Sequence, residues 1–254
     1  MKEVQQIKYR PLAGVEEKED KVYPSGSNAV GSPSTSGRTG GLSAGVGIAA
    51  VTIKNSEYRA YMMPVSVSYG ISKTNDLSFS LPVAYNEIPS AKNTKGLGDL
   101  SLNINNNFLN QDDFGFGLGF GLGLTFPTGK NDISGEDNEL DINFNAKAEK
   151  KIGSNSFNLS FGYTYNDCAD FSSGDYSKFS YGVSYSRGLS NKFSCSLELN
   201  VPDIFAKDNN FTQILFLGNR YSISNKMSAT VLAGKNIGDS SLNKIFIGSM
   251  SYSF

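Results

Sequence analysis

Few residues of this chain have the types needed for catalysis. The sequence contains no histidine and two cysteines, Cys168 and Cys195. A Ser–His–Asp triad, a cysteine–histidine pair and a zinc site therefore cannot be assembled. We expect Cys168 in a long loop and Cys195 near the opposite end of the fold, so no disulfide should join them. The composition predicts a protein that is not an enzyme and holds no metal or cofactor.

Acidic residues at two places are candidates for ion binding. Four carboxylates lie close together in one polar stretch: Asp132, Glu136, Asp137 and Glu139. Such a group could bind calcium, although a solvated acidic loop is the simpler interpretation. Asp99 follows two nearby glycines, Gly96 and Gly98, at the start of a predicted strand, where a carboxylate that caps a turn is more common than an ion ligand.

The elements that must position any site are β-strands. From Leu42 onward, apolar residues recur at every second position, with turn residues at regular spacing. The pattern predicts twelve strands, at 42–53, 59–71, 77–85, 97–108, 114–126, 139–150, 156–166, 176–187, 192–201, 211–221, 226–234 and 242–254. Phe114, Phe116 and Leu118 begin one of the clearest apolar faces, in the strand predicted at 114–126.

The face opposite the apolar one is small and polar. It carries Ser78 and Ser80, the asparagines of 103–107, and five alternating glycines from Gly115 to Gly123. The solvent-exposed face of a soluble sheet is normally rich in Lys and Glu, whereas Ser, Asn and Gly suit a confined lumen. The alternation therefore favours an all-β fold, a membrane-spanning antiparallel up-and-down barrel with apolar residues toward lipid.

The overall composition is compatible with such a barrel. The 39% hydrophobic content and the mean hydropathy of −0.29 look like those of a soluble protein, but lipid-facing and lumen-facing residues cancel in any window average. No run of about 18 apolar residues is present, so no transmembrane helix is predicted. A net charge of −1 without a basic cluster argues against nucleic acid as a partner.

The predicted connections alternate between short turns and longer polar loops. Bacterial barrels have short periplasmic turns and longer outer loops. With an even number of strands, both the first and the last strand should have their free ends on the periplasmic side. Tyr69, Tyr185 and Tyr221 each precede a short turn. Their shared position predicts an aromatic belt at one membrane interface.

The first 41 residues differ from the rest. Residues 1–41 are polar and become Gly/Ser/Pro-rich from Pro24, which predicts a periplasmic tail, a linker or a plug. Residues 42–254 would form the barrel. The N-terminus lacks the apolar core of a signal peptide, so we expect that a leader has been removed.

Two sets of residues point into the lumen if the apolar alternates face lipid. The charged set is Asp141, Lys147, Glu149, Glu198 and Arg220. These charges could set ion preference, or they could pair with one another and stiffen the barrel.

The apolar set is Met62, Ile214, Phe216, Leu232, Ile245 and Ile247. It predicts a patch in the outer half of the lumen that either binds a hydrophobic solute or is covered by a plug or an infolded loop. A slip of one residue in the strand at 211–221 would instead turn Ile214 and Phe216 toward lipid.

Three short segments resemble a known family. They are Leu81-Pro82-Val83, Gly96-Leu97-Gly98-Asp99-Leu100 and Leu124-Thr125-Phe126-Pro127-Thr128-Gly129-Lys130. They are similar to segments of the bacterial outer-membrane proteins of the MetA-pathway of phenol degradation family. The resemblance covers roughly residues 42–254 and implies an outer-membrane barrel that transports hydrophobic compounds. It also implies that the barrel-assembly machinery reads the last strand, where Phe246, Met250, Tyr252 and Phe254 share one face.

These observations predict a bacterial outer-membrane channel or transporter for small hydrophobic or aromatic solutes. Its partners would be outer-membrane lipids, the barrel-assembly machinery and a small-molecule solute. The sequence leaves open whether the protein forms a homo-oligomer. One alternative is an export pore for a secreted protein or a functional-amyloid subunit, gated by residues 1–41. A further alternative is a structural β-protein without a transport role.

Overall fold

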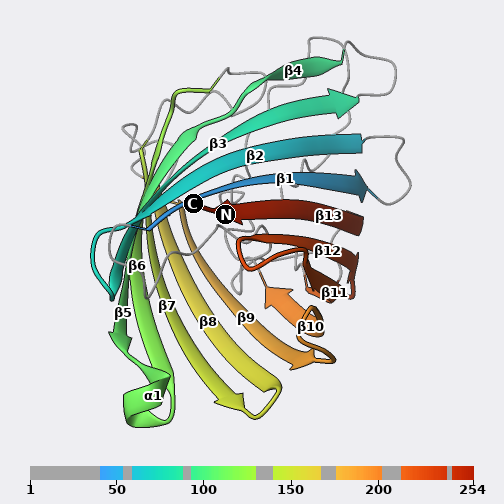
Figure 1. Cartoon of the computed structure of the whole chain (residues 1–254). Coiled ribbons are helices and arrows are strands. Elements are labelled where there is room, and N and C mark those ends of the chain that lie inside the picture. Colours follow the sequence, from blue (N-terminus) through green and yellow to red (C-terminus); the bar gives the residue numbers. More distant parts are fainter. Residues whose placement is uncertain are drawn as a thin grey trace.

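The strands form a single barrel wall. The computed structural model describes residues 41–53, 59–87, 93–129, 140–166, 176–201, 213–238 and 242–254, and Figure 1 shows how they are arranged. The elements are β1 (Leu42–Ile53), β2 (Arg59–Gly70), β3 (Asn75–Glu87), β4 (Thr94–Leu97), β5 (Leu100–Leu109), α1 (Gln111–Phe114), β6 (Gly117–Phe126), β7 (Asp141–Ile152), β8 (Asn155–Asn166), β9 (Tyr176–Gly188), β10 (Phe193–Val201), β11 (Ile214–Ser222), β12 (Met227–Asn236) and β13 (Leu242–Ser253).

Pairing between the two ends of the chain closes the barrel. Each strand pairs antiparallel with its neighbours, β1 pairs with both β2 and β13, and β2 pairs with β3. The backbone N–H of Phe254 also donates to the carbonyl of Leu42 at 2.9 Å. Closure leaves no strand edge in the hydrocarbon, where unpaired backbone groups are costly.

The predicted count of twelve strands is confirmed, with one strand interrupted. β4 and β5 pair with different parts of the same strand, β3, and Gly98-Asp99 separates them. The N–H of Gly98 donates to the carbonyl of Pro82 at 2.8 Å. Pro82 Cγ lies only 2.8 Å from where a Cβ at position 98 would stand, so the backbone bends where a side chain would collide.

The strand predicted at 114–126 begins later, at Gly117, and that boundary was wrong. Phe114 lies in the single turn α1, which ends at Gly115 with φ of +74°. The side chain of Gln111 fixes this turn against β7 by donating to the carbonyl of Lys151 (2.8 Å) and accepting from its N–H (2.7 Å). Four alternating glycines, not five, therefore lie in the strand.

The short turns share one local design. In three of them a serine hydroxyl accepts the N–H of the residue three positions later: Ser72 from Asn75, Ser190 from Phe193 and Ser224 from Met227, at 3.0–3.1 Å. The tighter β7–β8 hairpin places Gly153 at φ of +58°, a conformation that glycine adopts without strain. Tyr69, Tyr185 and Tyr221 lie on outward positions next to three of these turns, as the aromatic belt requires.

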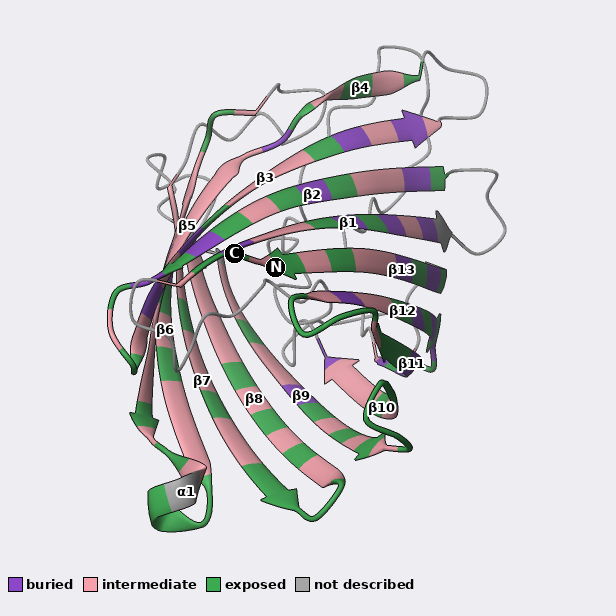
Figure 2. Cartoon of the chain, viewed as in Figure 1, coloured by how far each residue is buried: buried purple, intermediate pink, exposed green. Residues whose placement is uncertain are grey.

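The outer surface of the wall is apolar. Exposed and partly buried residues alternate along much of β8 and along the second half of β9 in Figure 2. Exposed residues of the wall include Phe144, Phe157, Leu159, Phe161 and Phe179. This reverses the arrangement of a soluble barrel, in which large apolar side chains fill the interior. Within the described ranges, no helix is long and apolar enough to cross a membrane.

Two adjacent residues of β8 test this arrangement. Phe161 points outward and is 54% exposed, whereas Ser160 points into the lumen opposite Gly182. We expect Phe161→Lys to destabilise the barrel in lipid vesicles by about 2–4 kcal/mol, because a charge near the bilayer midplane is poorly solvated. Ser160→Lys should change stability much less. Urea unfolding of both variants in vesicles measures the difference, and equal losses would contradict the outward placement of Phe161.

Candidate functional site

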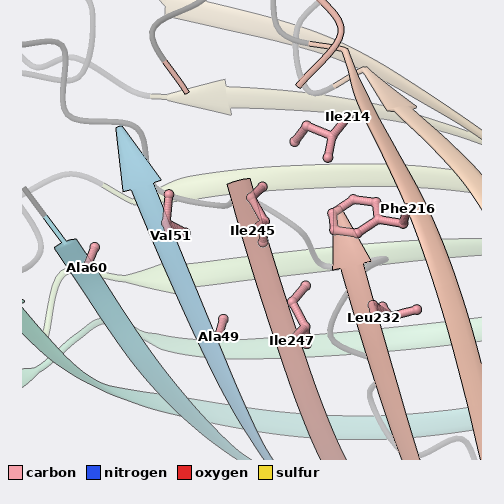
Figure 3. Packing of buried hydrophobic residues seen from close by; sticks show 8 residues of the cluster. All are labelled: Ala49, Val51, Ala60, Ile214, Phe216, Leu232, Ile245 and Ile247. Atoms are coloured by element: carbon pink, nitrogen blue, oxygen red, sulfur yellow. The ribbon is translucent and has the colours of Figure 1, made fainter. Parts of the chain in front are cut away.

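An apolar patch lines one side of the lumen. The apolar lumen cluster consists of Ala49, Val51, Ala60, Ile214, Phe216, Leu232, Ile245 and Ile247, with Met62 packed against it. Each of the eight is at most 5% exposed. Figure 3 shows their side chains gathered on five strands: β11, β12, β13, β1 and β2.

Strand register brings these residues together. Val51 pairs with Ile245 on one side and Ala60 on the other, and Ala49 pairs with Ile247 and Met62. Leu232 pairs with Ile247 across β12 and β13. Because paired residues share a face, the cluster is one continuous surface. The register also places Ile214 and Phe216 on the lumen face, level with Asn200 and Glu198, and not toward lipid.

Two glycines allow the largest side chains to lie flat against the wall. Phe216 pairs with Gly234, and its ring carbons stand 2.5 Å from where a Cβ at position 234 would be. Leu232 pairs with Gly218 and covers it in the same way. Any larger residue at these glycines would push the apolar side chains away from the wall.

The cluster lies near the mouth formed by the longer connections. Val51 is close to the end of β1, and Ile214 and Ile245 are close to the starts of β11 and β13. The short turns and the closing contact between Leu42 and Phe254 lie at the opposite rim. Burying an aliphatic or aromatic side chain contributes roughly 1.5–3 kcal/mol, and these side chains are already buried in the structure. Their apolar atoms offer a polar molecule no hydrogen bonds.

The opposite wall is polar. The glycines of β6 form a column flanked by asparagines of β5 and β7, including Asn103, Asn105, Asn143 and Asn145. Side-chain atoms of Asn105 and Asn145 come within 2.6 Å of where a Cβ at Gly121 would stand. The missing side chains of β6 therefore make room for the amides of its neighbours.

The charged lumen residues are not brought together into one site. Lys147 and Glu149 lie on β7 with their ionic groups 3.6 Å apart, and Lys151 approaches Glu149 more closely, at 2.8 Å. Glu198 accepts a hydrogen bond from the hydroxyl of Ser196 (3.1 Å) on its own strand, β10.

The remaining predicted charges lie elsewhere in the lumen. Arg220 on β11 donates to the hydroxyl of Ser228 (3.3 Å). Asp141 lies at the start of β7, level with Thr125 and Asn166. None of these contacts joins the charges of β7 to those of β10 or β11.

The lumen also contains a carboxylate that sequence reasoning missed. Asp76 is 4% exposed and accepts a hydrogen bond from the amide of Asn105 (2.9 Å). Next to it, Ser43, Ser68 and Ser78 form a buried row across β1, β2 and β3. Asn75-Asp76 is a typical turn pair, and the strand was therefore predicted to begin at Leu77. The alternation of Asp76 with Ser78 and Ser80 is the sequence signal that would have predicted its place in the lumen.

Other predicted residues lie away from the lumen or outside the described residues. Phe246, Met250, Tyr252 and Phe254 point outward and are 41–63% exposed. Asp99 accepts the N–H of Gly129 at 2.8 Å and so joins two connections at one rim. The acidic group at Asp132, Glu136, Asp137 and Glu139, and Cys168, lie outside the described residues. The described ranges contain no cluster of potential metal ligands.

Three solved structures that are similar to this chain are an outer membrane channel and two porins. The COG4313 outer membrane channel from Pseudomonas putida F1 has a TM-score of 0.67 and 16% identity, over 92% of this chain and 100% of the other. The KdgM porin has a TM-score of 0.56 and 10% identity, over 83% and 99%. For the NanC porin the values are 0.56 and 12%, over 82% and 98%. At these identities the likeness establishes the fold, a porin-like barrel.

No curated protein matches the sequence. A family model does, over residues 25–254, and its description is "Putative MetA-pathway of phenol degradation". This range includes all the described strands together with the three short segments that first pointed to the family. The chain therefore belongs to the family that bears this description.

Proposed function

We propose that this protein is a channel of the bacterial outer membrane for small hydrophobic or aromatic solutes. The observation that carries the proposal is the apolar lumen cluster, whose eight members are at most 5% exposed although they face the inside of a barrel. The lumens of porins, which pass ions and other polar solutes, are polar. An apolar lumen surface is therefore not expected in a channel for such solutes.

The two walls of the lumen would act differently on a solute. An apolar molecule that enters between the longer connections would pack against Val51, Phe216 and Ile245 close to the mouth. These side chains are at most 2% exposed, so the solute must first displace the protein atoms that cover them. The asparagines and glycines of β5, β6 and β7 line the facing side and offer hydrogen bonds to a hydroxyl or carbonyl group. Small aromatic molecules that carry one polar substituent fit both walls.

Residues 1–41 are proposed to regulate the channel as a plug. They precede β1 at the rim of the short turns. An extended chain spans about 3.3 Å per residue, so forty residues could reach well beyond the twelve residues of β1. A polar, Gly/Ser/Pro-rich segment can follow an irregular lumen without requiring a fold of its own.

The outward face would contact the lipids of the outer membrane. We also propose that the barrel-assembly machinery recognises the last strand through its outward row of Phe246, Met250, Tyr252 and Phe254. The rings of Tyr252 and Phe254 meet edge to face with their centroids 4.9 Å apart, which makes a compact aromatic end to the chain.

Replacing Phe216 by aspartate tests the role of the cluster. Phe216→Asp should reduce uptake of a small aromatic probe into vesicles by roughly tenfold, because about 1.5–3 kcal/mol of apolar contact per side chain is lost. Ser160→Asp on the polar wall is the matched control and should leave uptake within about twofold. Failure of Phe216→Asp to insert into vesicles would mean that the residue faces lipid, and unchanged uptake would remove the cluster from the proposal.

Removing the N-terminal segment tests the plug. Single-channel conductance in planar bilayers should be small for the full chain and should rise for a chain that starts at Leu42, because the described strands already close the barrel. A control chain in which residues 1–40 are replaced by a Gly/Ser linker of equal length separates occupation of the lumen from chain length. Equal conductance for the full chain and the shortened chain would contradict the plug.

The ion pairs of β7 yield a prediction about ion selectivity. Glu149 balances Lys147 and Lys151 inside the lumen. Glu149→Gln leaves two positive charges there and should shift the reversal potential in a salt gradient toward anion preference. Lys150→Gln, on the adjacent outward-facing residue, is the control and should not shift it. A reversal potential that stays the same in Glu149→Gln would show that ions do not pass this pair.

A further inference from the structure

The lipid-facing surface has a hollow of its own. A concavity of about 580 Å³ lies on the outer side of the wall, over strands β10 to β13 and β1. Its lining includes one row of paired outward residues, Ala50–Phe246–Ala233–Leu217–Leu197. The small side chains of Ala50 and Ala233 alternate with large ones, so the hollow lies between Phe246 and Leu217.

Two lysines lie at the end of the hollow that is nearer the longer connections. Lys235 and Lys244 also line it, and they pair directly across β12 and β13, one step nearer the rim of the longer connections. Both side chains are exposed. Like charges at paired positions repel and destabilise a sheet. Among the described residues no carboxylate forms an ion pair with either lysine, so this part of the chain supplies no counter-charge to relieve the repulsion.

The same rim carries further outward positive charge. Arg59 on β2 and Lys95 on β4 lie toward this end of their strands, and Arg59 is 3.9 Å from Glu87. The opposite rim also carries outward basic residues, Lys150 and Arg187, together with tyrosines that include Tyr69, Tyr185 and Tyr221. Basic side chains at a membrane interface attract anionic lipid headgroups, by about 1 kcal/mol per charge, while their aliphatic stems rest on apolar surface.

We propose that Lys235, Lys244 and the hollow beside them form a binding site for a phosphate-bearing, multiply acylated lipid of the surrounding membrane. The phosphate lies between the two ammonium groups and relieves their repulsion. An acyl chain lies over Ala233 between Phe246 and Leu217. The inference rests on the outer-membrane placement of the barrel and is independent of the solute that the lumen carries.

Lipid retention measured by native mass spectrometry tests the site. The purified full chain is titrated with bis-phosphorylated lipid A and, separately, with the same lipid after removal of its phosphates. The wild-type protein should retain the phosphorylated lipid at least tenfold more tightly, and high salt should weaken this preference. The double variant Lys235→Gln/Lys244→Gln should lose it. Ala233→Phe, which fills the hollow without altering charge, should weaken retention of both lipids.

Matched controls separate this site from general effects of charge and folding. Lys95→Gln/Lys150→Gln removes the same charge from two outward lysines that do not pair with each other and should keep the preference. Equal retention of both lipids by the wild type, or unchanged preference in Lys235→Gln/Lys244→Gln, would overturn the proposal. Unchanged retention in Ala233→Phe would contradict the proposed position of the acyl chain over Ala233. Uptake of the aromatic probe should be normal in every variant, so failure here is distinct from failure of the proposed channel.

Discussion

Every backbone N–H and C=O group of a membrane-spanning strand must be paired, because the hydrocarbon of the bilayer contains no water. The rest of the structure depends on this requirement. An open strand edge in hydrocarbon leaves several N–H and C=O groups unsatisfied, each at a cost of several kcal/mol. The chain meets the requirement by joining its first barrel strand to its last, from the pair Ser43–Ser253 to the pair Val51–Ile245. Every other feature of the wall follows from that closed ladder. The interruption at Gly98-Asp99 is tolerated because β4 and β5 remain paired to one neighbour, β3.

Closure also brings together the apolar lumen cluster and the lipid-facing hollow, on which the two proposals rest. β11 and β12 are separated from β1 and β2 by most of the sequence, yet β13 joins them into one wall. On the lumen side this wall carries Phe216, Leu232 and Ile247, and on the lipid side it carries Phe246, Ala233 and the lysine pair. Successive residues of a strand face opposite sides, so the same short segments serve a proposed solute path and a proposed lipid site without sharing side chains.

The alternation of residue types predicted most of the fold, and local chemistry explains where it failed. Large apolar residues such as Phe157, Leu159 and Phe161 identified the strands because they recur at every second position on the outward face. The prediction failed at Phe114, where the alternation of glycine and phenylalanine extends into a helical turn. Both residue types are compatible with a strand or a turn. The hydrogen bonds between Gln111 and Lys151 stabilise the turn. Asp76 was left out of its strand because Asn75-Asp76 is typical of a turn, although Asn105 on the neighbouring strand holds it in the lumen.

The sequence by itself determined the period, the number of strands and the face of most residues within them, because these depend on positions two residues apart. Only the tertiary structure decided which residues meet across strands. The flat packing of Phe216 on Gly234 and the facing of Lys235 with Lys244 depend on register and on side-chain rotamers. A shift of one residue between strands would preserve the sequence pattern and separate every one of these partners.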